Sequence, residues 1–237
     1  VEESWARRRG RSTGVFAVGR NLLPFPAMSA LSAVVVLEFA RGVAGPYCGR
    51  LLADLGATVI KFEPPGGDPL RLAGPLAGGE SAFFNYLNAG KLSFVAPAVA
   101  AVPPEALKRA DVVVHDLLGI EAERLERMAT AANPAAVVVS LSPYGRSGEK
   151  SGWQATPFTE WATSGFFYFA GDPAREPLSL PGHQAEFHAG LHAGVAAMAG
   201  LRHARETAEG QCIEISHQEA CLNDHAWLTT MWTHQGA

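Results

Sequence analysis

The fold of this chain is most constrained by four short runs of consecutive apolar, largely β-branched residues. The runs are Ala33–Phe39, Thr58–Glu63, Asp111–Asp116 and Ala135–Ser142. Strands buried on both faces of a parallel sheet have this continuous, valine-rich character, because neither face meets water. The first two runs flank a helical pattern that stops at Gly56, and such a strand–helix–strand unit makes its two strands parallel. The sequence therefore predicts an open, mostly parallel α/β sheet, with a nucleotide-like ligand at the carboxyl ends of its strands.

The last third of the chain is predicted to be mostly helical. Helices are expected over Gln184–Arg205 and Gln218–Trp232, with a short strand at Gln211–Ser216 between them. The segment Pro64–Ser81 is too rich in glycine and proline for a regular element. A loop of this length in a compact domain is typically functional or disordered. Residues 1–30 are expected to be a disordered leader or upstream sequence, because they are arginine-rich, carry two early acidic residues and lack a long apolar core.

Charge and cysteine content exclude several classes of partner. The chain has 237 residues and a net charge of −4, so no basic field is available to attract nucleic acid or an anionic membrane surface. No apolar run approaches the length needed to span a bilayer. The cysteines are too few and too scattered for a disulfide framework or a zinc ribbon; they are Cys48, Cys212 and Cys221. A reducing cytoplasm is the compartment that this composition indicates.

The segment Pro181–Gly194 carries the candidate chemistry. His188 and His192 are four residues apart and share one face of the predicted helix, which is one way to hold a metal ion. Glu186 stands in the first turn of the same helix, where a carboxylate is stabilised by the helix dipole. A metal-binding helix of the His-Glu-x-x-His type places its glutamate between the histidines, which is not the order here. The pattern therefore argues against a metal site, and it leaves Glu186 as either a reactive carboxylate or a solvated glutamate in a first turn.

An ordered series of motifs resembles class III CoA-transferases, the family of L-carnitine dehydratase and bile-acid-inducible protein F, which includes formyl-CoA transferase and α-methylacyl-CoA racemase. The resemblance extends from about residue 31 to the end of the sequence. Its motifs are Ala44-Gly45-Pro46, Leu52–Ala57, Val59-Ile60-Lys61, Gly67-Asp68-Pro69 with Arg71, and Asn88 with Lys91. Later segments, including "VVVSLSPYGRSG" and "ETAEGQCIEISHQEA", follow in the family's order.

The resemblance implies a Rossmann-like large domain, here residues 31–237, with the family's second domain absent or truncated. It also implies a tightly interlinked homodimer that uses acyl-CoA and carboxylic acid substrates, with coenzyme A as a substrate and no metal or redox cofactor. CoA-transferases of the family use an aspartate nucleophile at the start of a helix, and Glu186 occupies that position in this sequence. Because Glu186 can attack a thioester as an aspartate does, the implied activity is CoA transfer through a glutamyl intermediate.

Further residues are implied in CoA binding. Lys91 matches the family lysine that meets the nucleotide phosphates, and Arg71 has a similar place; the alternative for each is an ordinary solvated cation. Gly42 and Val43 fall where family members approach CoA with the backbone. After the fourth predicted strand, a loop at the expected active-site wall contains Tyr144, Gly145 and Gly148. Glycines also mark ordinary turns, so this loop has a purely structural alternative.

The sequence departs from the family pattern at two places, and two other functions are compatible with the resemblance. Pro64-Pro65 and the segment His115–Gly119 replace residues that usually help to hold CoA. One rival function is a catalytically inactive half that binds CoA or dimerises with an active subunit. The other is an acyl-CoA racemase, which needs an acid–base pair. Where racemases carry Gly-His-Asp, this chain has Gly152-Trp153-Gln154, which argues against racemisation.

Overall fold

A computed structural model describes residues 16–17 and 29–236. Its main feature is a seven-stranded sheet in the order β1-β6-β3-β2-β7-β8-β9. All neighbouring strands are parallel except β1 and β6, which are antiparallel. The strands of this sheet are β1 (Phe16–Ala17), β2 (Val35–Phe39), β3 (Thr58–Glu63), β6 (Leu92–Val95), β7 (Val112–His115), β8 (Val137–Ser142) and β9 (Cys212–Ser216). The predicted mostly parallel α/β sheet is confirmed.

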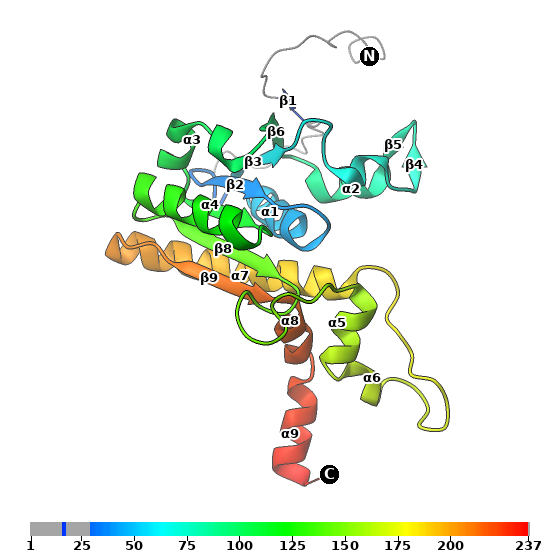
Figure 1. Cartoon of the computed structure of the whole chain (residues 1–237). Helices are drawn as coiled ribbons and strands as arrows, with labels where there is room; N and C mark the ends of the chain where they lie inside the picture. The colour runs from blue at the N-terminus through cyan, green and yellow to red at the C-terminus, as the bar shows by residue number, and fades with distance from the viewer. Residues whose placement is uncertain (1–15, 18–28, 237) are drawn as a thin grey trace.

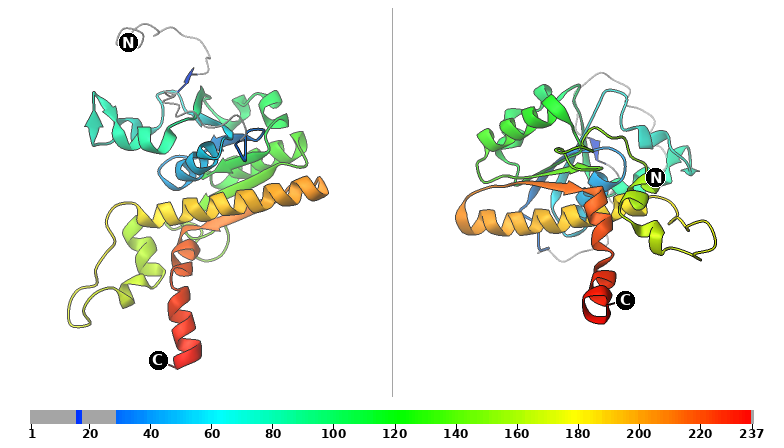
Figure 2. Two further views of the ribbon diagram at one scale, coloured as in Figure 1. Left: turned by 180° about the vertical axis from the view of Figure 1, so that it is seen from behind. Right: turned by 60° about the horizontal axis from the view of Figure 1, so that its bottom comes forward.

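Helices cover both faces of the sheet (Figures 1 and 2). One face packs on α1 (Ala44–Asp54) and α7 (Gln184–Thr207), and the other packs on α3 (Pro104–Lys108) and α4 (Gly119–Ala132). Successive residues of a strand point to opposite faces, so Val112 and Val114 join the first core while Val113 joins the second. This double burial explains why the strands appear in the sequence as unbroken valine runs.

The remaining short elements lie in two groups. The first group follows β3 and comprises η1 (Pro69–Leu72), β4 (Leu76–Ala77), β5 (Glu80–Ser81) and α2 (Ala82–Asn88), with η2 (Val99–Ala101) after β6. The second group comprises α5 (Pro157–Thr163), α6 (Phe166–Phe169), α8 (His217–Asn223) and α9 (Ala226–Gln235). The prediction that Pro64–Ser81 contains no regular element was wrong, because it holds a 3₁₀ turn and a small hairpin. The single helix predicted over Gln218–Trp232 is interrupted between α8 and α9.

The N-terminal leader predicted for residues 1–30 falls almost entirely outside the described residues. Within the described residues, no helix is long and apolar enough to cross a membrane. The division of the chain into a leader and a large domain stays a prediction.

Close packing of α7 on α1 depends on glycine at one position. A Cβ atom on Gly190 would lie 2.5 Å from the backbone oxygen of Ala44 and 3.1 Å from the Tyr47 side chain, so the two helices would have to separate. At Gly194, one turn later, an added Cβ would meet only a Leu51 methyl group at 3.5 Å, which is an ordinary contact.

Gly190→Ala is therefore expected to lower the free energy of unfolding by about 1–3 kcal/mol, the usual cost of overpacking a core. Urea denaturation followed by circular dichroism measures this change. Gly194→Ala is the matched control and is expected to be neutral or stabilising by up to about 1 kcal/mol, because alanine favours a helix more than glycine does. Equal effects of the two substitutions would contradict the close approach at Gly190.

Candidate active site

Glu186 lies in the first turn of α7, at the end of the helix that faces the carboxyl edge of the sheet. The crossover from β8 to β9 sets this polarity, because a helix that joins two parallel strands runs back toward their amino ends. The side chain of Glu186 is 19% exposed, and its Oε2 atom pairs with Nδ1 of His183. Burial raises the pKa of the Glu186 carboxyl, while the hydrogen bond to His183 acts in the opposite direction. The site thus holds a half-buried carboxylate at a helix N-terminus, where partial positive charge helps to keep it ionised.

The N-terminus of α1 is packed beside Glu186. Gly190, one turn after Glu186, contacts the Ala44 backbone, and the rings of Tyr47 and Phe187 meet edge to face with centroids 4.8 Å apart. Gly42 and Val43 immediately precede this helix, at the end of β2. Gly42 adopts a φ of 65° that suits glycine, and the approach of Gly42 and Val43 to CoA stays a prediction.

The predicted loop after β8 lies in the same region. The Tyr144 hydroxyl donates to Oγ1 of Thr159 at 3.2 Å, which ties the loop to α5. Gly145 and Gly148 both have a φ of 88°, a left-handed conformation that glycine adopts at low cost. Both glycines thus have a conformational role in this loop, and a contact of Tyr144, Gly145 or Gly148 with CoA stays a prediction.

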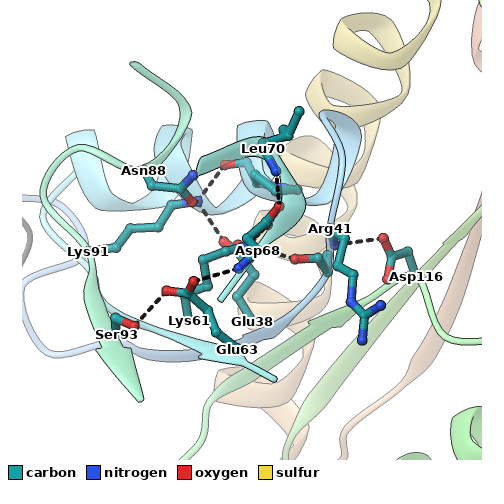
Figure 3. Close-up of polar contacts among 12 residues, drawn as sticks. Glu38, Arg41, Lys61, Glu63, Asp68, Leu70, Asn88, Lys91, Ser93 and Asp116 are labelled. Carbon is teal, nitrogen blue, oxygen red and sulfur yellow. Dashed lines mark hydrogen bonds and ion pairs between the residues drawn. The ribbon is translucent and has the colours of Figure 1, made fainter. Parts of the chain in front are cut away.

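Lys91 has a different environment from the one that phosphate binding requires. Its side chain is 1% exposed, and Nζ donates to Glu38 at 2.7 Å, to the Pro46 carbonyl at 2.7 Å and to Asn88 at 3.0 Å (Figure 3). An ammonium group has three N–H donors, so all of them are used inside the protein. Burial lowers the pKa of Lys91 to about 8, although Glu38 opposes the shift. This geometry gives Lys91 a structural role and does not support the expected phosphate contact.

Lys61 completes a buried ionic network around Glu38. Its Nζ lies 3.0 Å from Glu38 and 3.1 Å from Asp68, and it also donates to the Ala40 carbonyl at 2.7 Å. Burial lowers the pKa of Lys61, but Glu38 and Asp68 outweigh this effect, so the pKa is raised overall. The network holds the buried Asp68 against strands β2 and β3, and it thereby anchors the glycine-rich segment that follows β3 (Figure 3).

Arg71 anchors the same segment through Glu63. The guanidinium forms two parallel hydrogen bonds to the carboxylate, both 2.7 Å long, and stacks over the Phe84 ring at 4.1 Å. Burial would raise the pKa of Glu63, but hydrogen bonds from Arg71 and Ser93 lower it to about 2. The guanidinium is partly exposed, yet its charge is already paired, so Arg71 is not supported as a CoA ligand by this geometry.

One of the two segments that depart from the family pattern, His115–Gly119, begins at the end of β7. Asp116 accepts the backbone N–H of Arg41 at 2.7 Å, which joins the ends of β2 and β7 (Figure 3). The connection after β2 runs through α1 on one face of the sheet and the connection after β7 runs through α4 on the other, and open α/β sheets usually bind ligands at such a point. Burial raises the pKa of Asp116 to about 6. His115 is buried and its Nε2 lies 3.2 Å from Glu126, so it is part of the core.

The two histidines considered as metal ligands, His188 and His192, make contacts with neighbouring protein groups. His188 pairs through Nδ1 with Asp224, and His192 lies 2.9 Å from the His188 carbonyl and 3.2 Å from Asn223. Among the residues described, no three His, Cys, Asp or Glu side chains are grouped closely enough to hold a metal ion.

Two functional candidates were missed from the sequence. Glu160 of α5 is 3% exposed, and its Oε1 lies 2.8 Å from Nδ1 of His217, the first residue of α8. Both side chains act electrostatically on Glu186. The two residues are 57 positions apart and fit no local pattern, so no sequence signal could have paired them.

Comparison with known proteins identifies the family. The model of CoA-transferase family III matches residues 31–237. The chain belongs to this family. It is 33% identical over 205 residues to succinate–glutarate CoA-transferase of Agrobacterium fabrum, covering 78% of this chain and 50% of that protein. It is 30% identical to human succinyl-CoA:glutarate CoA-transferase, covering 91% of this chain and 52% of that protein.

Solved structures agree with this membership in CoA-transferase family III. A CaiB/BaiF family protein from Brucella suis superposes with a TM-score of 0.78 at 27% identity, covering 88% of this chain and 58% of that one. The chain spans about half the length of the curated relatives it matches. The resemblance to class III CoA-transferases found in the sequence is confirmed.

Proposed function

We propose that this chain forms the Rossmann-like part of a CoA-transferase that moves CoA from an acyl-CoA to a carboxylic acid through Glu186. The observation that carries the proposal is the position of Glu186. It is a half-buried carboxylate in the first turn of α7, paired with His183 and beside the start of α1. Membership in CoA-transferase family III supports the reaction class.

The proposed reaction has two symmetrical halves. The Glu186 carboxylate attacks the thioester carbonyl, CoA leaves as a thiolate, and a mixed anhydride forms between the acyl group and Glu186. The thiolate then attacks the Glu186 carbonyl, which releases the donor acid and leaves a glutamyl-CoA thioester. The acceptor carboxylate attacks the glutamyl carbonyl of this thioester, which expels the CoA thiolate and forms a second mixed anhydride. The thiolate then attacks the acceptor's acyl carbonyl, which gives the new acyl-CoA and regenerates the Glu186 carboxylate.

We infer that both acids are dicarboxylic. The two curated relatives described above carry succinate, succinyl-CoA and glutarate in their names. Their identity to this chain supports the same substrate class here.

A covalent adduct tests the proposal. The longest natural form of the protein is incubated with succinyl-CoA, quenched in acid and digested with trypsin, which releases residues 176–202 as one peptide. A CoA-sized mass increase is expected on this peptide, and fragmentation must place it on Glu186. Glu176 lies in the same peptide and is exposed, so Glu176→Gln is the matched control and is expected to retain the adduct. Binding of CoA without any adduct would contradict the proposal and favour a catalytically inactive half.

We also propose that the protein forms a homodimer. Large apolar side chains are exposed on the surface of α7, α8 and α9: Leu191, Val195, Met198, Leu222, Trp227 and Trp232. Exposed apolar surface of this kind is typical of regions that another chain or domain covers.

A further inference from the structure

Three helices meet immediately behind Glu186. Trp161 of α5, Ala185 of α7 and Cys221 of α8 form one buried apolar cluster. Glu160 precedes Trp161 in the chain, and His217 lies one turn before Cys221 on the same face of α8. This packing places α5 and the start of α8 next to the first turn of α7 (Figure 1). Glu160 and His217 are therefore near Glu186, which follows Ala185.

Among the described residues, the buried carboxylate of Glu160 has one polar side-chain partner, His217. Its Oε1 atom lies 2.8 Å from Nδ1 of His217, and within residues 29–236 its buried Oε2 atom has no hydrogen-bond partner. A buried carboxylate is costly unless it is paired, so His217 is the group that stabilises Glu160. Gln218 reinforces this geometry, because its side-chain amide donates to the Thr163 carbonyl of α5 at 2.7 Å.

Glu160 and Glu186 are two carboxylates in one partly dehydrated region. Burial makes the largest contribution to the raised pKa of Glu186, and the charge of Glu160 adds to it. The hydrogen bond from His183 and the charge of His217 act in the opposite direction. A nucleophilic carboxylate must be ionised, so a second carboxylate nearby is a disadvantage unless its charge is offset.

We propose that Glu160 and His217 form a charge-compensating pair behind Glu186, in which His217 is a positioning residue that offsets the charge of Glu160 and so keeps Glu186 ionised. The catalytic consequence rests on the proposed role of Glu186 as the nucleophile. His217 thus acts on Glu186 both by its own charge and by its pairing with Glu160.

The other charged groups that the described contacts place around this part of α7 each have a partner. His183, before the helix, is bonded to Glu186 itself. From α1, Arg50 and Asp54 pair with each other at 2.7 Å. His188, further along α7, pairs with Asp224 after α8. Substitution of His217 therefore leaves these neighbouring pairs in place, and a change in the titration of Glu186 can be assigned to His217.

The test is a pH titration of the Glu186 carboxyl group by ¹³C NMR, with the protein labelled at its glutamate side-chain carboxyl carbons. The Glu186 resonance is identified by its loss in Glu186→Gln. His217→Phe leaves Glu160 uncompensated and is expected to move the Glu186 midpoint to higher pH. Glu160→Gln removes the second negative charge and is expected to move the midpoint to lower pH. In the double variant, His217→Phe should raise the midpoint less than it does in the wild-type background.

One further variant and two possible outcomes test the inference. His217→Asn retains a neutral donor near the Nδ1 position and is expected to raise the midpoint less than His217→Phe. An equal rise in both backgrounds would show that His217 acts without Glu160, and unchanged midpoints in all variants would show that the pair does not act on Glu186; either result overturns the inference. The titration does not depend on turnover. Shifted midpoints without any covalent adduct would support the charge compensation and reject the proposed function.

Discussion

Glu186→Gln is expected to abolish CoA transfer, with a fall in kcat on the order of 10⁴-fold or more, as when other enzymes lose their nucleophile. The amide preserves the size of the side chain and its position in the first turn of α7, but it cannot open the thioester. Binding of CoA should persist, because the residues that contact CoA are unchanged. Transfer of CoA from succinyl-CoA to glutarate, followed by chromatography of the acyl-CoA products, measures the change.

Glu186→Asp separates the chemistry of the carboxylate from its position. Aspartate retains the charge but withdraws the carboxylate by one methylene, and a displacement of about 1 Å can cost about 100-fold in rate. An intermediate activity, about 100-fold below that of the unmodified protein, is therefore expected. If Glu186→Gln retained full activity, Glu186 would not be the nucleophile. If Glu186→Asp were fully active, the pocket would not be shaped to the longer side chain.

The second large effect is expected at the buried ionic network. Glu38→Gln keeps the shape of the side chain but leaves the ammonium groups of Lys61 and Lys91 without their shared carboxylate. Breaking a buried ion pair by removal of one partner typically costs about 3–5 kcal/mol, because a buried charge is left uncompensated. Urea denaturation should show the free energy of unfolding reduced by about this amount.

Glu123→Gln is the matched control for this substitution. Glu123 forms an exposed ion pair with Arg127 on α4, and exposed pairs contribute little because water and salt screen them. The control should therefore leave the unfolding transition essentially where it is. A Glu38→Gln variant as stable as this control would show that the network does not stabilise the fold.

The main sheet was predictable from the sequence because its signal is local. Strand β3 has the predicted bounds, Thr58–Glu63, and β8 (Val137–Ser142) lies within the predicted run Ala135–Ser142. Runs of valine and the 3.6-residue period each fall within one element, so no tertiary information is needed to recognise them. The start of α7 at Gln184 was also predicted, and with it the placement of Glu186 in a first turn.

The environment of the cations was not predictable, because it depends on residues far apart in the chain. Lys91 looks like a surface lysine in its own segment, and only the packing of the turn between α2 and β6 against β2 and α1 reveals that Glu38 and Pro46 enclose it. The same limit applies to Glu160 and His217, which meet only when α5 and α8 pack together. The break between α8 and α9 was missed because both sides have a helical pattern.

The ionic network around Glu38 also bears on the order in which the chain folds. Lys91 and Glu38 are 53 residues apart, whereas Lys61 and Glu38 are separated by 23. Contacts between residues distant in sequence form late, because the loop between them must first be closed at a cost in entropy. The network can close only when β2, β3 and β6 are already assembled. The network is therefore expected to form after the transition state for folding. An interaction of this kind slows unfolding more than it speeds folding.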